Sequence, residues 1–229
     1  MSNRELLKEL LDRSLVNTRP GTIFETAPPP LGEEFDFRRI QGMLLGLAIG
    51  DSLGVTTESI NPGKRHAQYG EITDYLPNRY AYNQRVGLPS DDTQLAFWSL
   101  EQILLDQAIN PENIAQRFTK RKIFGIGQTV RDFLRNYKAG VPWYKSGPQS
   151  AGNGALMRIC PVMLPYMPSP SRELWADTVL LTMITHNDSV AIGCSLAFVS
   201  MLWELLQCQE PPPGEWYLNH FVRYCLKWK

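Results

Sequence analysis

The sequence predicts an all-α protein. Beyond the first 33 residues, apolar side chains recur at spacings of three and four, the period of helices that bury one side. Alternation of period two, typical of strands, is almost absent, and only "HAQYGEITDYLP" could hold a short extended piece. The 229 residues, of which 43% are hydrophobic, can build one core of good size. The predicted helices are 37–50, 91–107, 111–122, 126–138, 154–164, 172–184, 189–207 and 215–227.

The N-terminal residues predict an arm ahead of the domain. Ser2 and Glu5 have the spacing of a capping box, and leucines follow on one side of a short amphipathic helix. The next stretch, "NTRPGTIFETAPPPLGEE", is too rich in Pro and Gly to continue a helix and predicts an extended linker. We therefore expect an arm over 1–33 and a domain over 34–229. The arm could dock on a partner protein or fold back on its own domain.

Composition excludes several classes of function. Lys plus Arg and Asp plus Glu are balanced at 23 each, so no excess charge points to nucleic acid or to an anionic membrane. The longest apolar stretch, 191–203, is too short to span a bilayer, and the charged N-terminus is no signal peptide. We expect a cytoplasmic protein with free thiols, because its cysteines form no C-x-x-C pair. These cysteines are Cys160, Cys194, Cys208 and Cys225.

The segment "RIQGMLLGLAIGDSLGVTTE" combines glycines with two carboxylates. Gly42, Gly46 and Gly50 fall on one helix face, where a small-residue stripe predicts that another helix approaches the backbone closely. The helix then ends in a tight exit that presents Asp51, and Glu58 follows in a hydroxyl-rich loop. From composition alone, Glu58 is either a solvated surface carboxylate or part of a site.

The segment "GLPSDDTQLAFWSL" places Asp91 and Asp92 between Ser90 and Thr93 at the start of a predicted helix. One interpretation is local, because Ser90 is a good N-cap and acidic residues in the first turn favour the helix dipole. The other is a hard-cation site, because Mg²⁺ prefers carboxylate and hydroxyl oxygens.

Two further segments carry polar groups next to helix ends. In "SAGNGALMRI", Gly152, Asn153 and Gly154 lead into a predicted helix, where backbone N–H groups can approach a phosphate, although such residues also form ordinary turns. In "ITHNDSVAIGCSLAF", His186 lies between two predicted helices. A lone His there is either a structural hydrogen-bonding group or a ligand contact, and the lack of a nearby Cys or second His speaks against zinc.

In this order, the four segments resemble the ADP-ribosylglycohydrolase family, which includes the dinitrogenase reductase activating glycohydrolase and the ADP-ribosylarginine hydrolases. The resemblance covers about 39–198. The residues that carry it are Gly42, Gly46, Ala48, Gly50, Asp51, Leu53, Gly54 and Glu58, then Ser90, Asp91, Asp92 and Thr93, then Gly152, Asn153, Gly154, Met157 and Arg158, and finally Thr185 and His186.

The resemblance implies a compact all-α fold with a binuclear Mg²⁺ centre, or sometimes Mn²⁺. It implies hydrolysis of the bond that joins ADP-ribose to a protein side chain, with arginine the favoured acceptor, or to a related compound. The implied substrate is an ADP-ribosylated protein or ADP-ribose itself. The implied metal ligands are Ser90, Asp91 and Asp92, the implied catalytic carboxylates are Glu58 and Asp92, and the implied substrate-binding residues are Asp51, Gly152, Asn153, Gly154 and His186.

The sequence departs from the family pattern in one place. The family supplies further metal ligands from a D-x-D-[ST] motif near its C-terminus, and no such motif follows His186 here. We therefore expect a C-terminally incomplete family member. The alternative function is a catalytically impaired ADP-ribose-binding protein, or one that neutralises an ADP-ribosylating enzyme through its N-terminal arm.

Overall fold

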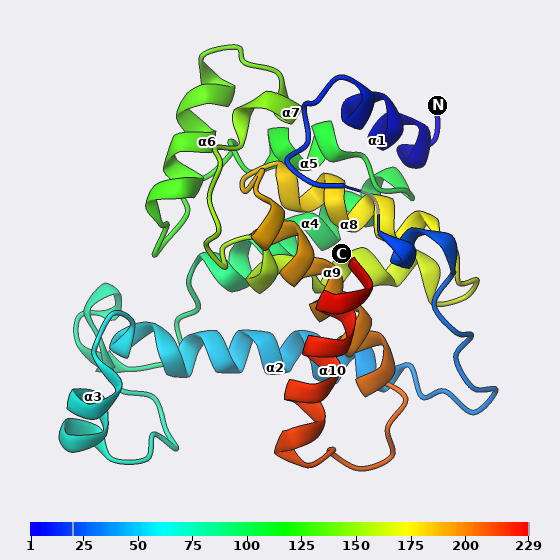
Figure 1. Ribbon diagram of the computed structural model, residues 1–229. Coiled ribbons are helices and arrows are strands. Elements are labelled where there is room, and N and C mark those ends of the chain that lie inside the picture. Colours follow the sequence, from blue (N-terminus) through cyan, green and yellow to red (C-terminus); the bar gives the residue numbers. More distant parts are fainter. Residues whose placement is uncertain (20, 229) are drawn as a thin grey trace. The chain divides into compact units, whose positions relative to one another are not determined.

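The computed structural model describes residues 1–19 and 21–228, with the side chains of 225–228 left undescribed. The fold is all-α, as predicted (Figure 1). The chain forms two compact units. Unit 1 comprises Met1–Asp36, Ala96–Lys122 and Gly127–Lys229, and unit 2 comprises Phe37–Leu95 and Ile123–Ile126.

Unit 2 begins with a long helix and continues into short elements. Its elements are α2 (Arg38–Gly54), the 3₁₀ turn η2 (Val55–Thr57), α3 (Pro62–Tyr69), β1 (Pro77–Asn78), the 3₁₀ turn η3 (Arg79–Ala81), β2 (Gln84–Arg85) and the first turn of α4 (Asp91–Asp106). The two strands pair antiparallel, with Pro77 opposite Arg85.

Helix α3 corrects one expectation, because it occupies the first part of the stretch that could have been extended. The signal for it lies just upstream, where Asn61 Oδ1 accepts a hydrogen bond of 3.0 Å from Gly63 N and Pro62 occupies the first helical position. Asn followed by Pro at this point is a helix start.

Unit 1 contains the apolar core. Helices α8 and α9 pack against each other, and α10 packs on α9. Both α8 and α9 are apolar on most sides, which is typical of helices buried within a core. The elements are α1 (Asn3–Asp12), the 3₁₀ helix η1 (Thr22–Glu25), the rest of α4, α5 (Pro111–Arg117), α6 (Gln128–Lys138), α7 (Trp143–Ser146), the 3₁₀ helices η4 (Leu156–Arg158) and η5 (Cys160–Tyr166), α8 (Glu173–Met183), α9 (Ser189–Leu205) and α10 (Gly214–Trp228).

The predicted α-helix over 154–164 is wrong in type, since the chain there forms the two 3₁₀ helices η4 and η5. Pro161 and Pro165 lie in this segment. Proline lacks the N–H that an α-helical ladder needs, so the segment winds in short 3₁₀ turns.

The N-terminal arm folds back on unit 1. The capping box is present: Glu5 N donates to Ser2 Oγ at 3.2 Å, and Ser2 N donates to Glu5 Oε2 at 2.7 Å. Leu7 and Leu10 are buried, and α1 packs against α8 (Figure 1). The leucine side of the arm therefore packs in the chain's own core, which is the second of the two alternatives left open by the sequence.

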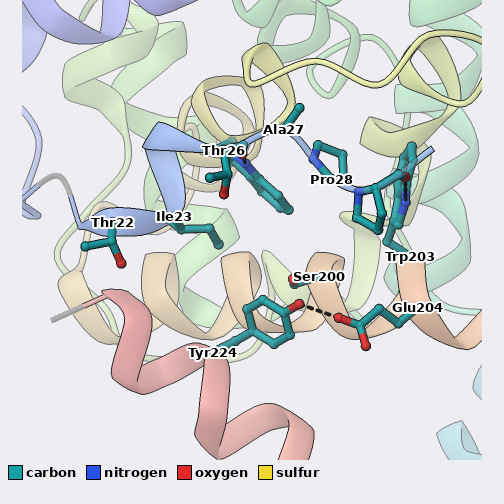
Figure 2. A pocket seen from close by; sticks show the side chains of 11 residues that line it. Thr22, Ile23, Thr26, Ala27, Pro28, Ser200, Trp203, Glu204 and Tyr224 are labelled. Carbon is teal, nitrogen blue, oxygen red and sulfur yellow. Dashed lines mark hydrogen bonds between the residues drawn. The ribbon is translucent and has the colours of Figure 1, made fainter.

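The linker that follows η1 is held by two indoles. Trp175 Nε1 donates to the Thr26 carbonyl at 2.7 Å, and Trp203 Nε1 donates to the Pro29 carbonyl at 2.8 Å. Between this linker and helices α8 to α10 lies a cavity of about 320 Å³, on whose opposite side Tyr224 donates a hydrogen bond to Glu204 (Figure 2).

The glycine stripe of α2 differs from its prediction. A Cβ built on Gly42, Gly46 or Gly50 meets none of the described atoms within 4 Å. On the same helix Leu45 and Ile49 are 60% and 49% exposed. Within unit 2, no described atom therefore makes the close approach that we expected for this face. A stripe of small residues defines a face but does not determine what covers it.

Within the described residues, we find no helix with both the length and the apolar character needed to cross a lipid bilayer. Cys160 and Cys194 are free thiols, as expected. The fourth cysteine, Cys225, lies outside the described side chains.

Candidate functional site

The predicted site residues form two groups, one within each unit. The carboxylate group, in unit 2, contains Asp51, Glu58, Ser90, Asp91 and Asp92. The loop group, in unit 1, contains Gly152, Asn153, Gly154 and His186.

In the carboxylate group, Asp51 caps helix α4. Its Oδ2 accepts hydrogen bonds from Ser90 N at 2.7 Å and Thr93 N at 3.1 Å, two of the N–H groups that have no partner inside the helix. It also accepts from the hydroxyls, from Ser90 Oγ at 2.6 Å and from Thr93 Oγ1 at 2.7 Å. The side chain of Ser90 is therefore not the cap we expected. A carboxylate from the end of α2 takes that place, because it can accept four hydrogen bonds at once.

Asp91 and Asp92 crowd against other carboxylates. Asp91 is only 7% exposed, and burial together with the negative charges of Asp92, Glu58 and Asp51 raises its pKa to about 6. Burial and the charges of Asp51 and Glu58 also raise the pKa of Asp92. These shifts show that the fold brings four carboxylates close enough to repel one another, an arrangement that a bound cation stabilises.

Gly125 lies directly against this group. A Cβ at this position would come within 2.9 Å of both Asp91 Oδ1 and Ser90 Cβ, and its φ of +73° also favours glycine. The neighbouring Phe124 N donates to Gln94 Oε1 at 2.8 Å, which holds the segment on α4. The sequence analysis assigned no role to Gly125. Only the tertiary contact shows that its missing side chain leaves room for Asp91.

The side chains of Ser90, Asp91 and Asp92 carry oxygen ligands, the type that Mg²⁺ prefers. Among the described residues, no three His, Cys, Asp or Glu side chains are arranged to hold a metal. Mg²⁺ is commonly bound through one or two carboxylates, with waters and substrate oxygens completing its octahedron. Asp91 and Asp92 offer two such carboxylates. Because Ser90 Oγ donates its proton to Asp51, its lone pairs remain available as a third oxygen ligand.

Glu58 is exposed at the edge of a cavity of about 310 Å³ within unit 2. Arg79 lies over the ring of Tyr80, 4.8 Å from its centroid, on the wall of this cavity. Asn78 is buried, and its Oδ1 accepts from Tyr80 N at 2.8 Å, which fixes the turn that carries both residues. Thr56 also lines this cavity, and its buried hydroxyl Oγ1 has no hydrogen-bond partner among the described residues. Such a cavity can admit a polar side chain next to the carboxylate of Glu58.

In the loop group, two glycines make room for the His186 ring. A Cβ on Gly154 would lie 2.8 Å from His186 Cε1, and one on Gly152 would lie 3.4 Å from His186 Nε2. Asn153, between them, is exposed, and its carbonyl accepts from Met157 N at 3.1 Å. The close approach of the imidazole thus requires glycine at position 154, whereas a Cβ at position 152 would make ordinary contact with the ring.

A buried chain of hydrogen bonds orients His186. Arg158 is 1% exposed and donates through Nη2 to Thr185 Oγ1 at 2.7 Å and to the Leu181 carbonyl at 3.1 Å. The Thr185 hydroxyl can then donate to His186 Nδ1, 2.8 Å away, which leaves the hydrogen of the imidazole on Nε2, the nitrogen next to Gly152. In the sequence, Arg158 and Thr185 stand out only as residues of the family motifs. The structure shows that they form the hydrogen-bonded chain behind His186.

The electrostatics of this chain keep His186 neutral. Burial and the charge of Arg158 lower the pKa of His186 to about 4. Burial also lowers the pKa of Arg158, to about 9. The Arg158 guanidinium lies over the Phe118 ring, 5.0 Å from its centroid. Arg158 therefore puts a buried positive charge two hydrogen bonds away from the His186 ring, which lies against Gly154.

A family model for ADP-ribosylglycohydrolase matches residues 33–228. The chain belongs to this family. The match covers the segments that carry both groups of site residues, and the N-terminal arm lies ahead of it.

Relatives in the family and a solved structure agree with this assignment. The chain is 26% identical to ADP-ribosylarginine hydrolase Tri1 of Pseudomonas putida (strain GB-1), over 85% of this chain and 56% of that protein. It is 28% identical to the ADP-ribosyl-[dinitrogen reductase] glycohydrolase of Rhodospirillum rubrum, over 73% of this chain and 58% of that protein. A solved ADP-ribosylglycohydrolase-related protein complex superposes with a TM-score of 0.63 at 28% identity, covering 80% of this chain and 60% of the other. The chain thus spans little more than half the length of these relatives.

Proposed function

We propose that this ADP-ribosylglycohydrolase removes ADP-ribose from a modified arginine side chain of a protein. The observation that carries the proposal is the crowding of four carboxylates in unit 2, with the pKa of Asp91 raised to about 6 by burial and by its acidic neighbours. Carboxylates stabilise the oxocarbenium character that develops when a glycosidic bond breaks. The names of the relatives support the acceptor, since one of them is an ADP-ribosylarginine hydrolase.

In this proposal, Ser90, Asp91 and Asp92 hold Mg²⁺. When bound, Mg²⁺ supplies positive charge that lowers the pKa of a bound water and polarises sugar oxygens. Asp51 serves the same region indirectly, because its hydrogen bonds to Ser90 and Thr93 fix the first turn of α4. These bonds keep the two aspartates at a fixed position on the helix.

Glu58 moves the proton in the reaction. It takes a proton from the attacking water as the water oxygen bonds to the ribose C1 atom, and the bond from C1 to the guanidine nitrogen breaks. The proton passes to the leaving nitrogen, so the products are ADP-ribose and an unmodified arginine. The cavity beside Glu58, lined by Thr56, Asn78 and Arg79, is the place we propose for the acceptor side chain.

The loop group binds the ADP-ribose. The N–H groups of the glycine-rich loop and the Nε2–H of His186 are donors suited to phosphate and ribose oxygens. Because the pKa of His186 is lowered to about 4, the ring stays a neutral donor across the physiological range.

The test is release of ADP-ribose from a protein modified on arginine, measured with Mg²⁺ and again with a chelator. Glu58→Gln keeps the size of the side chain but removes the proton acceptor, and we expect a loss of about 100-fold or more. The matched control is Glu71→Gln, which changes an exposed carboxylate of the same unit and should leave the rate unchanged.

Calorimetric titration with ADP-ribose completes the test. Binding without release would support the alternative of a catalytically impaired ADP-ribose-binding protein. Absence of both binding and release would contradict the proposed function. An ADP-ribose affinity that changes neither with Mg²⁺ nor in the double variant Asp91→Ala, Asp92→Ala would contradict the proposed metal site.

A further inference from the structure

The N-terminal arm reaches the turn that carries His186. After α1, the chain turns at Ser14, which has a left-handed φ of 54°, and runs towards the α8–α9 connection. Val16 is buried there with 6% exposure. The next residue, Asn17, lies beside Asn187, which directly follows His186 in the sequence.

Three hydrogen bonds join the arm to Asn187. Asn17 N donates to Asn187 Oδ1 at 2.9 Å, and Asn17 Nδ2 donates to the Asn187 carbonyl at 2.7 Å. In the opposite direction, Asn187 Nδ2 donates to the Leu15 carbonyl at 2.8 Å. Both the amide side chain and the carbonyl of Asn187 are therefore bonded to the arm. We call these three bonds the Asn17–Asn187 clamp.

Asn187 also holds the glycine-rich loop from its other side. Its backbone N donates to the Pro148 carbonyl at 3.0 Å, four residues before Gly152. Next to Pro148, a Cβ on Gly147 would come within 2.3 Å of the Met183 carbonyl, so the start of the loop lies tight against the end of α8. One residue thus connects the arm, the His186 turn and the loop that faces the imidazole.

We propose that the N-terminal arm is a positioning element of the ADP-ribose site, and that Asn17 acts through Asn187 to hold His186 against the Gly152–Gly154 loop. The inference rests on the proposed role of that loop in binding ADP-ribose. It assigns the arm, which lies ahead of the family match, to the substrate site of its own chain.

The arm has a second anchor that provides a control. At its beginning, Asn3 Nδ2 donates to Asp177 Oδ1 and to the Ile109 carbonyl, far along the arm from Asn17. Asn3→Ala loosens the arm without removing any bond to Asn187. It therefore separates a general loss of stability from a specific loss of positioning.

The experiment compares Asn17→Ala, Asn187→Ala and Asn3→Ala in the full chain, with ADP-ribose affinity and urea unfolding measured for each. Losing a neutral hydrogen bond destabilises the clamped arrangement by a factor of about 2 to 10, so we expect ADP-ribose affinity to fall by up to that factor for Asn17→Ala and by more for Asn187→Ala, which loses two bonds. Asn17→Ala removes only the bond from Asn17 Nδ2, and Asn187→Ala removes the other two bonds of the clamp. The double variant Asn17→Ala, Asn187→Ala removes all three bonds and should bind at least as weakly as Asn187→Ala alone. Asn3→Ala should lower stability and leave affinity within about 2-fold.

A second readout needs no ligand. The chain has three histidines, so the imidazole NMR signals of His186, His66 and His220 can be assigned by substitution. Asn17→Ala should shift or broaden the His186 signal and leave that of His66, an exposed residue of unit 2, unchanged.

Wild-type affinity and an unchanged His186 signal in Asn17→Ala would overturn the inference, and so would equal affinity losses in Asn17→Ala and Asn3→Ala. If the wild-type protein does not bind ADP-ribose, the proposed function fails. The NMR comparison then decides by itself whether the arm positions His186.

Discussion

Removing the Asp51 carboxylate should destabilise the start of α4. Asp51→Ala takes away the acceptor of four hydrogen bonds, two from backbone N–H groups and two from hydroxyls. Loss of a helix cap costs about 1 kcal/mol, and each hydrogen bond to a charged group contributes about 1.5–3 kcal/mol. Ser90 and Thr93 are 5% and 8% exposed, so in the variant their N–H and hydroxyl donors have little access to water. Because water can enter the space that the carboxylate leaves, we expect a total loss of about 2–4 kcal/mol rather than the full sum.

The assay is urea unfolding followed by circular dichroism and by tryptophan fluorescence, so that non-coincident transitions reveal separate unfolding of the two units. Asp51→Asn, which keeps the shape and one acceptor oxygen, should lose about half as much. Asp12→Asn is the matched control, because Asp12 lies on an exposed helix face and pairs with the exposed Lys8 at 3.3 Å, so it should change stability by less than about 0.5 kcal/mol. If Asp51→Ala behaves like this control, Asp51 does not cap α4.

Three further perturbations follow from the structure. Gly154→Ala would place a Cβ 2.8 Å from the His186 ring, so ADP-ribose affinity measured by calorimetry should fall at least about 10-fold, whereas Gly32→Ala, with open space around it, should bind normally. Burial raises the pKa of Asp177 from 3.8 to about 7, so the folded chain binds this proton more tightly than the unfolded chain does. The free energy of unfolding therefore falls as pH rises between these two pKa values. Asp177→Asn should flatten that part of the pH dependence in urea unfolding, and an unchanged slope would contradict the assignment. Leu45→Glu changes a side chain that is 60% exposed on α2, so unfolding should shift by under about 0.5 kcal/mol, and a larger loss would mean that this face is covered in solution.

Local signals in the sequence were sufficient where one segment decides its own structure. The capping box of α1 and the start of α9, where the Asp188 side chain accepts from Val190 N, both depend on residues within a few positions of each other. The same holds for the resemblance, because its motifs are short strings whose order along the chain suffices to identify the family.

Local signals failed where a competing partner lay elsewhere in the chain. Ser90 has the composition of an N-cap, yet Asp51, 39 residues earlier, takes its place because a carboxylate accepts more hydrogen bonds than a hydroxyl. The glycines of α2 share a face as expected, but no described atom of unit 2 covers it. A sequence pattern defines which residues share a helix face, but only tertiary packing decides what contacts that face.

For the candidate site, the sequence by itself determined which residue types are present: two adjacent aspartates with hydroxyls, a G-N-G loop and a histidine between helices. Only the tertiary structure decided their chemical states. It buried Asp91 among other carboxylates, which raises its pKa, and it placed Arg158 and Thr185 behind His186, which keeps the imidazole neutral. It also brought Asn17 to Asn187 across 170 residues of sequence. The physical reason is that charge repulsion, desolvation and hydrogen bonding depend on distance in space, which a sequence pattern records only for neighbours along the chain.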